Sequence, residues 1–260
     1  MTLITLTTDF GLTDPFAGIM KGVIASRAPD VRVVDLTHGI PPQDVVAGAL
    51  VLRHAVPYFP PGTVHVAVVD PGVGSARRAL CVETGHGVLV GPDNGLLSLA
   101  APPADVRRIV HLTEERFFLS PRSATFHGRD VFAPVAAALA TGTPPSALGT
   151  PVAEMQRLEL PTPVRDGRSV RGQVIYVDRF GNLSSNVGAE LLAALPRPPV
   201  SIAIRDVRLR GVAPSYASVA PGEPVAVVNS WGLLEIAVRD GSARERLGAR
   251  LGEPIVIEAS

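Results

Sequence analysis

The sequence contains only one cysteine and one lysine, and each shortage limits what the protein can be. Cys81 cannot form an intramolecular disulfide, and its strand-like surroundings indicate a buried structural thiol. Lys21 lies in an ordinary helix-like segment, so any Schiff-base or phosphate-binding lysine would have to be this residue. We therefore expect a cytoplasmic protein, in a reducing compartment, without a disulfide framework.

An excess of charge and long apolar runs are also absent. The 24 basic and 24 acidic residues give a formal net charge of +0, so no overall field attracts nucleic acid or anionic lipid. The N-terminus has no basic leader, and no apolar stretch approaches the ~18 residues that span a bilayer. We expect a soluble protein with a small-molecule partner, no nucleic-acid partner and no membrane partner.

Several familiar catalytic signatures are missing as well. The sequence has no GxxxxGKS phosphate loop, no GxSxG nucleophile elbow, no HExxH motif, no paired CxxC and no GxGxxG after a strand. The classes of enzyme that depend on these motifs are therefore not expected here.

The pattern of strand-like and helix-like segments changes along the chain and predicts two domains. Residues 1–150 alternate apolar strands with helical segments, which is typical of an α/β domain with a largely parallel central sheet. Residues 151–168 contain prolines without periodicity and indicate a linker. Residues 169–260 contain short strands separated by Gly, Pro, Asn and Asp, so we expect a smaller, mainly β C-terminal domain.

Three aspartates close or follow the first three predicted strands. These are Asp9, Asp35 and Asp70. Ligands of such sheets bind beyond the carboxyl ends of the strands, so the three acids are candidates for a site. Aspartate is also a favoured turn residue, and each of them taken alone is explained as well by a turn.

Five polar strings interrupt the apolar pattern. They are TTDFG at 7–11, DPGVGSARR at 70–78, TFHGRD at 125–130, DRFGN at 178–182 and NSWG at 229–232. His127 in TFHGRD is either a satisfied loop histidine or a catalytic group at a helix entrance. DRFGN is either a glycine turn or a recognition loop, in which Phe180 stacks, Asn182 pairs with a base edge and Asp178 meets a cation.

Taken together, the five strings resemble the S-adenosyl-L-methionine hydroxide adenosyltransferases, which are adenosine-forming hydrolases related to fluorinase and chlorinase. Their order and approximate spacing match over nearly the whole chain. The resemblance implies an α/β N-terminal domain, a linker and a barrel-like β domain. It also implies a homotrimer, in which S-adenosyl-L-methionine lies between the N-terminal domain of one subunit and the C-terminal domain of its neighbour.

The resemblance also assigns substrate contacts around the ribose and the methionine amino group. It implies that Asp9 binds the ribose hydroxyls and that Asp14 and Asp178 lie near the amino group. Thr125 and Phe126, in the string that carries the histidine, complete this part of the expected substrate-binding set.

Further expected contacts lie toward the C-terminus. Phe180 and Asn182 would meet the adenine, and Tyr216 would add an aromatic wall. Ser230 matches a serine that binds methionine, whereas its neighbour Trp231 stands where the halogenases have arginine.

The catalytic residues implied by the resemblance are Asp70, Arg77 and His127. The halogenases have tyrosine in place of this aspartate and serine in place of Gly128, so the chain resembles the branch that uses water. Because the sulfonium makes methionine a good leaving group, the enzyme has to place a nucleophile behind the ribose 5′ carbon. Arg77 would favour hydroxide, His127 would take the proton and Asp70 would orient either partner. We expect adenosine and L-methionine as products, and neither a metal nor a cofactor.

Three alternatives remain open on the sequence. The first is a halogenase of the same family, and the second is a non-catalytic module that binds S-adenosyl-L-methionine or adenosine. The third is a metal-dependent hydrolase with Asp9, Asp35, His38 and Asp70 as ligands, although the segment around His38 also fits a plain turn.

Overall fold

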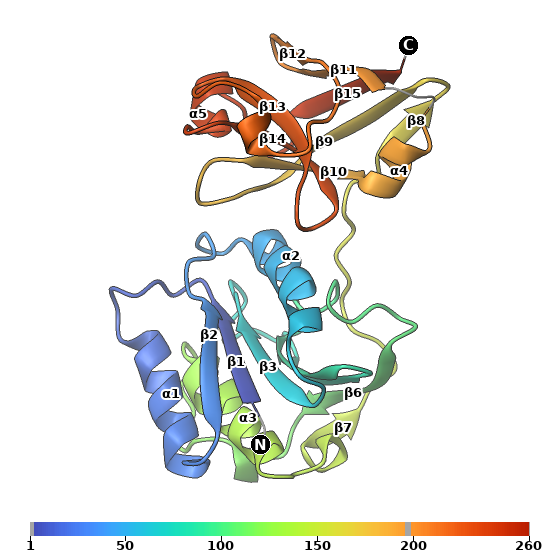
Figure 1. Ribbon diagram of the computed structural model, residues 1–260. Coiled ribbons are helices and arrows are strands. Elements are labelled where there is room, and N and C mark those ends of the chain that lie inside the picture. The colour runs from blue at the N-terminus through green and yellow to red at the C-terminus, as the bar shows by residue number, and fades with distance from the viewer. Residues whose placement is uncertain (1–2, 196–198, 260) are drawn as a thin grey trace. The chain divides into compact units, whose positions relative to one another are not determined.

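A computed structural model describes residues 3–195 and 199–259, and the chain divides into two compact units (Figure 1). Unit 1 is Met1–Leu158 and unit 2 is Glu159–Ser260. The division lies within the segment 151–168, in which β7 (Gly149–Pro151) ends and β8 (Val164–Asp166) begins the second unit.

Unit 1 is an α/β domain, as the sequence predicts. Its other elements are β1 (Leu3–Thr8), α1 (Phe16–Arg27), β2 (Arg32–Thr37), α2 (Val45–Ala55), β3 (Thr63–Val68), β4 (Ala79–Thr84), β5 (Gly87–Pro92), β6 (Val106–Leu112) and α3 (Ala133–Ala140). The seven strands form one sheet in the order β2-β1-β3-β5-β4-β6-β7. Strands β2, β1, β3 and β5 pair in parallel, whereas the pairings among β5, β4, β6 and β7 are antiparallel. The sheet is therefore mixed, and its parallel half holds the first three strands.

Helices cover both faces of the parallel half. β1 is buried on both sides, with Ile4 and Leu6 on one face and Thr5 and Thr7 on the other. Helices α1 and α3 pack together over the face of Ile4 and Leu6. The chain moves from β1 to β2 and then back to β3, so right-handed crossovers place α2 on the opposite face (Figure 1). Two aliphatic layers thus fix the strand ends that carry the candidate acids.

The strand ends differ in a way that the sequence does not reveal. Asp9 directly follows β1 and Asp70 follows β3 within two residues, so both lie at the carboxyl edge of the sheet. Asp35 instead lies inside β2, which continues to Thr37. Helix α1 begins at Phe16, directly after Pro15. Cys81 is fully buried in β4, and burial raises the pKa of its thiol to about 12, so it is a core residue.

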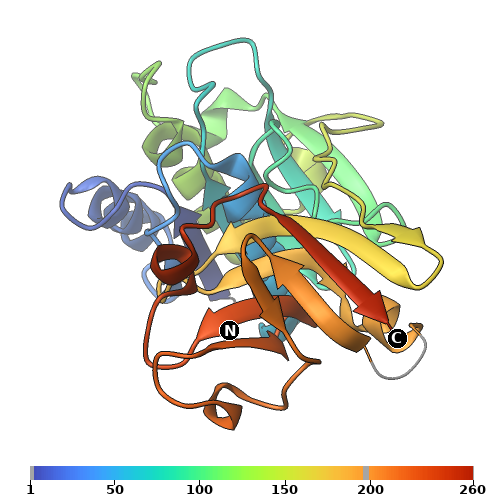
Figure 2. The ribbon, with the colours of Figure 1, turned by 90° about the horizontal axis from the view of Figure 1, so that it is seen from above.

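Unit 2 is mainly β, as predicted. It contains β8, β9 (Ser169–Val177), β10 (Leu183–Gly188), α4 (Ala189–Ala193), β11 (Pro199–Ile204), β12 (Val207–Leu209), β13 (Pro224–Val228), β14 (Leu233–Val238), α5 (Ala243–Leu247) and β15 (Pro254–Ala259). The main path is β12-β11-β15-β9-β10-β14-β13, and β8 pairs with β9. β12 also contacts β13, the strand at the other end of the path, so the antiparallel sheet curls into a barrel-like form (Figure 2).

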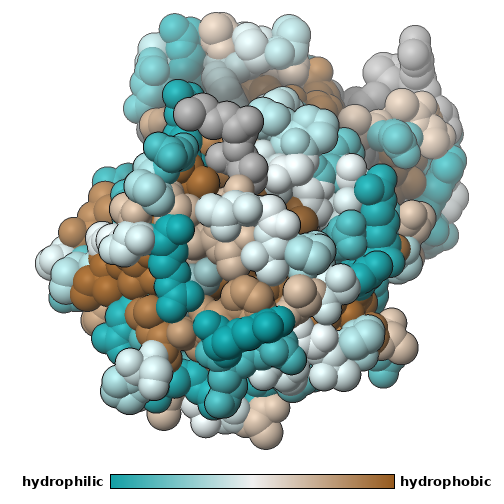
Figure 3. All heavy atoms as spheres, turned by 90° about the horizontal axis from the view of Figure 1, so that it is seen from below, coloured by the Kyte–Doolittle hydropathy of each residue, from teal (hydrophilic) through white to brown (hydrophobic). Residues whose placement is uncertain are grey.

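The helices in the part of the chain that the structure describes fall short of the length and apolarity that a bilayer requires. None of them is both long enough and apolar enough to cross one. The face seen in Figure 3 shows hydrophilic side chains interspersed among apolar ones.

Candidate active site

Asp70, Arg77 and His127 form one hydrogen-bonded cluster in unit 1. Arg77 Nε donates to Asp70 Oδ1 at 2.9 Å, and Arg77 Nη2 donates to Asp70 Oδ2. The same Nη2 lies 2.8 Å from His127 Nδ1. The side chains of Arg77 and Asp70 are only 8% and 5% exposed, so the pair is screened little by solvent. The structure therefore brings together the three residues that the sequence analysis names as catalytic.

The contact between Arg77 and His127 fixes the tautomer of the imidazole. A guanidinium only donates hydrogen bonds, so Nδ1 of His127 has to accept, and the neutral ring carries its proton on Nε2. Burial, followed by the Arg77 cation, lowers the pKa of His127, although Asp70 acts in the opposite direction. His127 is therefore neutral near pH 7 and presents an N–H donor on the side away from Arg77.

Gly74 permits the two loops of this cluster to approach each other. It has φ of +78°, and a Cβ there would collide with the backbone carbonyl oxygen of Ala124. A glycine at this position lets the loop after β3, which carries Asp70 and Arg77, touch the segment before His127. Gly74 of the DPGVG string thus sets the geometry of the cluster as well as the turn.

A cavity of about 410 Å³ lies beside the cluster, at the carboxyl edge of the sheet. Its lining includes Asp9, Asp70, Thr125, Phe126 and His127, all of which are predicted site residues. Asp14 is exposed at the entrance to α1 and does not line this cavity. The cavity thus gathers five predicted residues of unit 1 into one concave surface.

Residues that the sequence analysis missed also shape this cavity. Phe10 and Phe16 line it, and each meets Phe126 edge to face, with ring centroids 5.9 and 5.3 Å apart. Gln43 also lines it, and its backbone N–H donates to Asp9 Oδ2 at 2.8 Å. Phe10 lies within the TTDFG string, but nothing local to the sequence marks Gln43.

Gly128 has little space around it. A Cβ there would lie 3.1 Å from Met20 Sδ and 3.2 Å from the Phe126 ring. The residue opens a π-helical turn, Gly128–Phe132, that leads into α3. Within that turn Asp130 is buried and accepts hydrogen bonds from Arg129 and from the backbone of Ser123, so its role is to hold the loop.

Arg78 belongs to a separate ion pair. Its Nε donates to Asp93 Oδ2 at 2.7 Å, and Asp93 Oδ1 accepts from the backbone N–H of Gln156 at 2.7 Å. Asp93 is 4% exposed. This pair joins the end of β5 to the segment that leaves unit 1, and neither side chain lines the cavity.

The four residues weighed as metal ligands do not form a ligand set. Asp35 is held by Lys21, whose Nζ donates to Asp35 Oδ2 at 2.5 Å, and His38 Nδ1 lies 2.8 Å from the hydroxyl of Thr8. His38 Nε2 lies 3.1 Å from Asp35 Oδ1. Across residues 3–195 and 199–259, no group of three or more His, Cys, Asp or Glu side chains is arranged to hold a metal ion.

Unit 2 carries the remaining predicted residues. The DRFGN turn is organised by Asp178, whose Oδ1 accepts from the backbone N–H groups of Phe180 and Asn182, both at 2.9 Å. Asp178 Oδ2 accepts from Asn182 Nδ2 at 2.9 Å, so one amide hydrogen of Asn182 is already used. The turn leaves Phe180 74% exposed. Asp178 therefore shapes the loop that displays Phe180.

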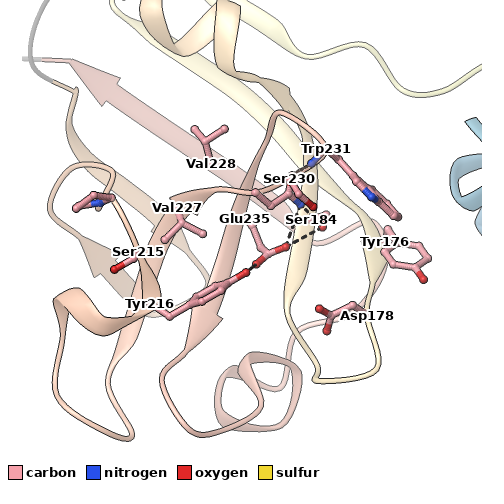
Figure 4. A pocket seen from close by; sticks show the side chains of 12 residues that line it. Tyr176, Asp178, Ser184, Ser215, Tyr216, Val227, Val228, Ser230, Trp231 and Glu235 are labelled. Atoms are coloured by element: carbon pink, nitrogen blue, oxygen red, sulfur yellow. Dashed lines mark hydrogen bonds between the residues drawn. The ribbon is translucent and has the colours of Figure 1, made fainter. Parts of the chain in front are cut away.

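Two cavities of unit 2 adjoin this turn. One of about 820 Å³ is lined by Asp178, Phe180, Asn182 and Tyr216, among others. Another of about 420 Å³ is lined by Ser230 and Trp231, and again by Asp178 and Tyr216 (Figure 4). Residues Asp178 and Tyr216 therefore stand between the two cavities, and each predicted residue of unit 2 lines at least one of them.

The smaller cavity also contains residues that the sequence analysis did not name. Tyr176 lies against Trp231, with ring centroids 4.8 Å apart. Glu235 forms part of the wall and is only 4% exposed. An acid in the middle of the apolar strand LLEIAV is the signal that reveals it.

Comparison with known proteins gives a consistent set of relatives. The SAM hydroxide adenosyltransferase N-terminal domain matches residues 4–149, and the C-terminal domain of the same name matches residues 172–256. A protein of Salinispora tropica named (R)-S-adenosyl-L-methionine hydrolase is 44% identical over 98% of this chain and 97% of its own. A fluorinase of Actinoplanes sp. is 26% identical over 90% of both chains. The crystal structure of an uncharacterized conserved protein from Thermotoga maritima superposes with a TM-score of 0.90 at 34% identity, covering 100% of each chain.

Proposed function

Because this chain belongs to the SAM hydroxide adenosyltransferase family, it is an S-adenosyl-L-methionine hydrolase, and we propose that Asp70, Arg77 and His127 are its catalytic residues. The observation that carries the proposal is the single guanidinium that contacts both Asp70 and His127 beside a cavity lined by Asp9. Asp70 and His127 line this cavity and Arg77 pairs with Asp70, so the cluster provides a buried ion pair and one directed N–H donor.

The reaction is a substitution at the ribose 5′ carbon, in which an oxygen nucleophile displaces methionine. The bond from the 5′ carbon to oxygen forms as the bond to the sulfonium sulfur breaks, and sulfur keeps the bonding electron pair. Methionine leaves as a neutral thioether, so no acid is needed to protonate it. The products are adenosine and L-methionine.

The cluster favours hydroxide as the nucleophile. His127 Nδ1 is used by Arg77, so the ring meets the nucleophile through Nε2–H and stabilises negative charge on its oxygen. The Arg77 cation acts in the same direction, and Asp70 holds that cation in place. The proton of water is released to solvent when hydroxide binds. This assignment gives His127 the role of a donor, in place of the proton acceptor suggested by the sequence alone.

The geometry of Gly128 favours hydrolysis over halogenation. A serine there would need Met20 and Phe126 to move by a few tenths of an ångström. The identity to the Salinispora hydrolase also exceeds that to the fluorinase by a wide margin, at 44% against 26%. The name of the hydrolase specifies the (R) form of the substrate, and we propose the same preference for this chain.

The substrate contacts and the assembly are further parts of the proposal. Asp9 would bind the ribose hydroxyls, and Phe180 and Asn182 the adenine. We propose a homotrimer in which the residues of unit 1 and those of unit 2 that contact one substrate come from neighbouring subunits. We also propose cytoplasmic location and a reaction without metal or cofactor, so that treatment with a chelator leaves the rate unchanged.

Hydrolysis in water enriched in heavy oxygen tests the chemistry directly. The purified protein is incubated with each sulfonium diastereomer of S-adenosyl-L-methionine, and adenosine is analysed by mass spectrometry. We expect label at the adenosine 5′-hydroxyl, faster turnover of the (R) form, and loss of turnover in His127→Ala. Label at another atom, or full activity of His127→Ala, would refute the assignment.

A further inference from the structure

Glu235 is a buried carboxylate in unit 2 that has neutral partners. It lies on β14 and is 4% exposed, and it forms no ion pair with a lysine, arginine or histidine of residues 3–195 and 199–259. It accepts hydrogen bonds from Tyr216 Oη at 2.7 Å, Asn229 Nδ2 at 2.9 Å and Ser184 Oγ at 3.3 Å (Figure 4). A charged group is costly to bury, and these three donors offset that cost.

Asn229 connects Glu235 to the NSWG turn through hydrogen bonds. Its Oδ1 accepts from the backbone N–H groups of Trp231 and Leu233, at 2.9 and 3.1 Å. The amide group therefore faces the carboxylate with its nitrogen and the turn with its oxygen. The Asn229 side chain thus adds two hydrogen bonds to the backbone bonds that close the turn of Ser230 and Trp231, which line the smaller cavity.

Tyr216 is bonded to Glu235 and forms part of the wall of both cavities. Its ring lines both cavities and is 45% exposed, while its hydroxyl is directed to the carboxylate (Figure 4). Burial and the bond to Glu235 raise the pKa of Tyr216 to about 12, so the hydroxyl remains a donor at neutral pH. With the hydroxyl engaged, Tyr216 offers the ring to a ligand.

We propose that Glu235 is a positioning residue for substrate binding, which orients Tyr216 and the turn of Ser230 and Trp231 at the same time. The proposal rests on the function proposed above and adds a residue to it. One carboxylate links the two walls on which the adenosyl and methionine parts of the substrate are expected to lie. Because the catalytic cluster is in unit 1, we expect the loss of Glu235 to weaken substrate binding and to leave the rate of the chemical step unchanged.

The test is Glu235→Gln, with Glu258→Gln as the matched control. Glu258 lies on β15 of the same unit and its side chain is 56% exposed, beside Arg208. Glutamine keeps the shape of Glu235 but removes its negative charge, so the charge-assisted bonds from Tyr216, Asn229 and Ser184 become weaker neutral ones. We expect KM for S-adenosyl-L-methionine to rise about tenfold and kcat to change less than about twofold, because a bond to a charged acceptor is strong. Glu258→Gln should leave both constants unchanged.

Trp231 supplies a readout that needs no turnover. It is the only tryptophan, so its fluorescence emission reports on the turn that Asn229 holds. We expect a shifted emission maximum in Glu235→Gln and an unchanged one in Glu258→Gln. Tyr216→Phe keeps the bond from Asn229 and should raise KM about threefold with no change in emission.

The outcomes of these experiments separate the proposed role of Glu235 from the proposed hydrolase function. Unchanged KM and unchanged emission in Glu235→Gln would overturn the proposal, as would equal falls in kcat in Glu235→Gln and Glu258→Gln. If the wild-type protein does not hydrolyse S-adenosyl-L-methionine, the proposed function fails, and the emission of Trp231 still decides whether Glu235 holds the turn. If Glu235→Gln does not fold, an unchanged KM in Tyr216→Phe overturns the proposal.

Discussion

Replacing Asp70 with asparagine should separate the catalytic use of the buried ion pair from its contribution to stability. Asp70 accepts two hydrogen bonds from Arg77, and both side chains are almost fully buried. Asparagine can accept only one of these bonds and turns an N–H group toward the guanidinium. Arg77 is then left buried without its counter-charge, and its contact with His127 is no longer fixed.

The expected magnitude follows from the burial. Breaking one partner of a buried pair costs ~3–5 kcal/mol, and the shape of asparagine places Asp70→Asn near the lower end. For a unit of this size ~3 kcal/mol corresponds to a fall in Tm of about 6–12 °C. If the same interaction positions the cation in the transition state, kcat/KM falls at least about 10²-fold.

The assay needs a control that is destabilised without touching the cavity. Asp93→Asn is that control, because Asp93 is a buried acceptor for the adjacent Arg78 in the same unit. Both variants are assayed for adenosine release at 25 °C, with Tm and the folded fraction measured by circular dichroism. We expect both to lose stability and only Asp70→Asn to lose activity per folded molecule. Equal losses of activity in the two variants, or an active Asp70→Asn, would refute the reasoning.

Three further predictions concern the same cavity. Neutral His127 accepts a bond from Arg77 and the protonated ring cannot, so kcat/KM should fall on the acid side with a midpoint below 6.5, since burial and Arg77 lower the pKa of His127; a pH profile with a midpoint above 6.5 would contradict this. Gly74→Ala should lower kcat/KM about tenfold, because the methyl group meets a backbone carbonyl; Gly62→Ala, which has a similar φ of +83° and open space, should cost stability alone. Gly128→Ser should slow hydrolysis through crowding, and chromatography in the presence of chloride should detect no 5′-chloro product.

The positions of Asp9 and Asp70 could be predicted because they depend on local pattern. Buried parallel strands are continuous apolar runs, and the first polar residue after such a run lies at the carboxyl edge of the sheet. The same argument was wrong for Asp35, because β2 continues for two residues beyond it and its side chain pairs with Lys21. A strand that continues through a polar residue gives no local warning that it does so.

Contacts between distant segments could not be predicted from pattern alone. Arg77 and His127 are 50 residues apart, and Asp9 and Gln43 are 34 apart. These contacts depend on the strand order β2-β1-β3, which brings the loops after β1 and β3 to neighbouring places. The resemblance to a known family supplied the association of Asp70, Arg77 and His127, and the structure supplied the tautomer of His127, which no motif encodes.

Lys21, which pairs with Asp35, also makes unit 1 simple to probe by proteolysis, because the chain has a single lysine. Lys21 is the only lysine and lies in the middle of α1, so a lysine-specific protease has one bond to cut, between Lys21 and Gly22. Cutting requires α1 to open, and when closing is fast the cleavage rate reports the free energy of that opening. Phe16 at the start of α1 lines the cavity, so a ligand bound there should slow this single cut. One scissile bond thus converts substrate binding into a change in protease resistance that a gel can record.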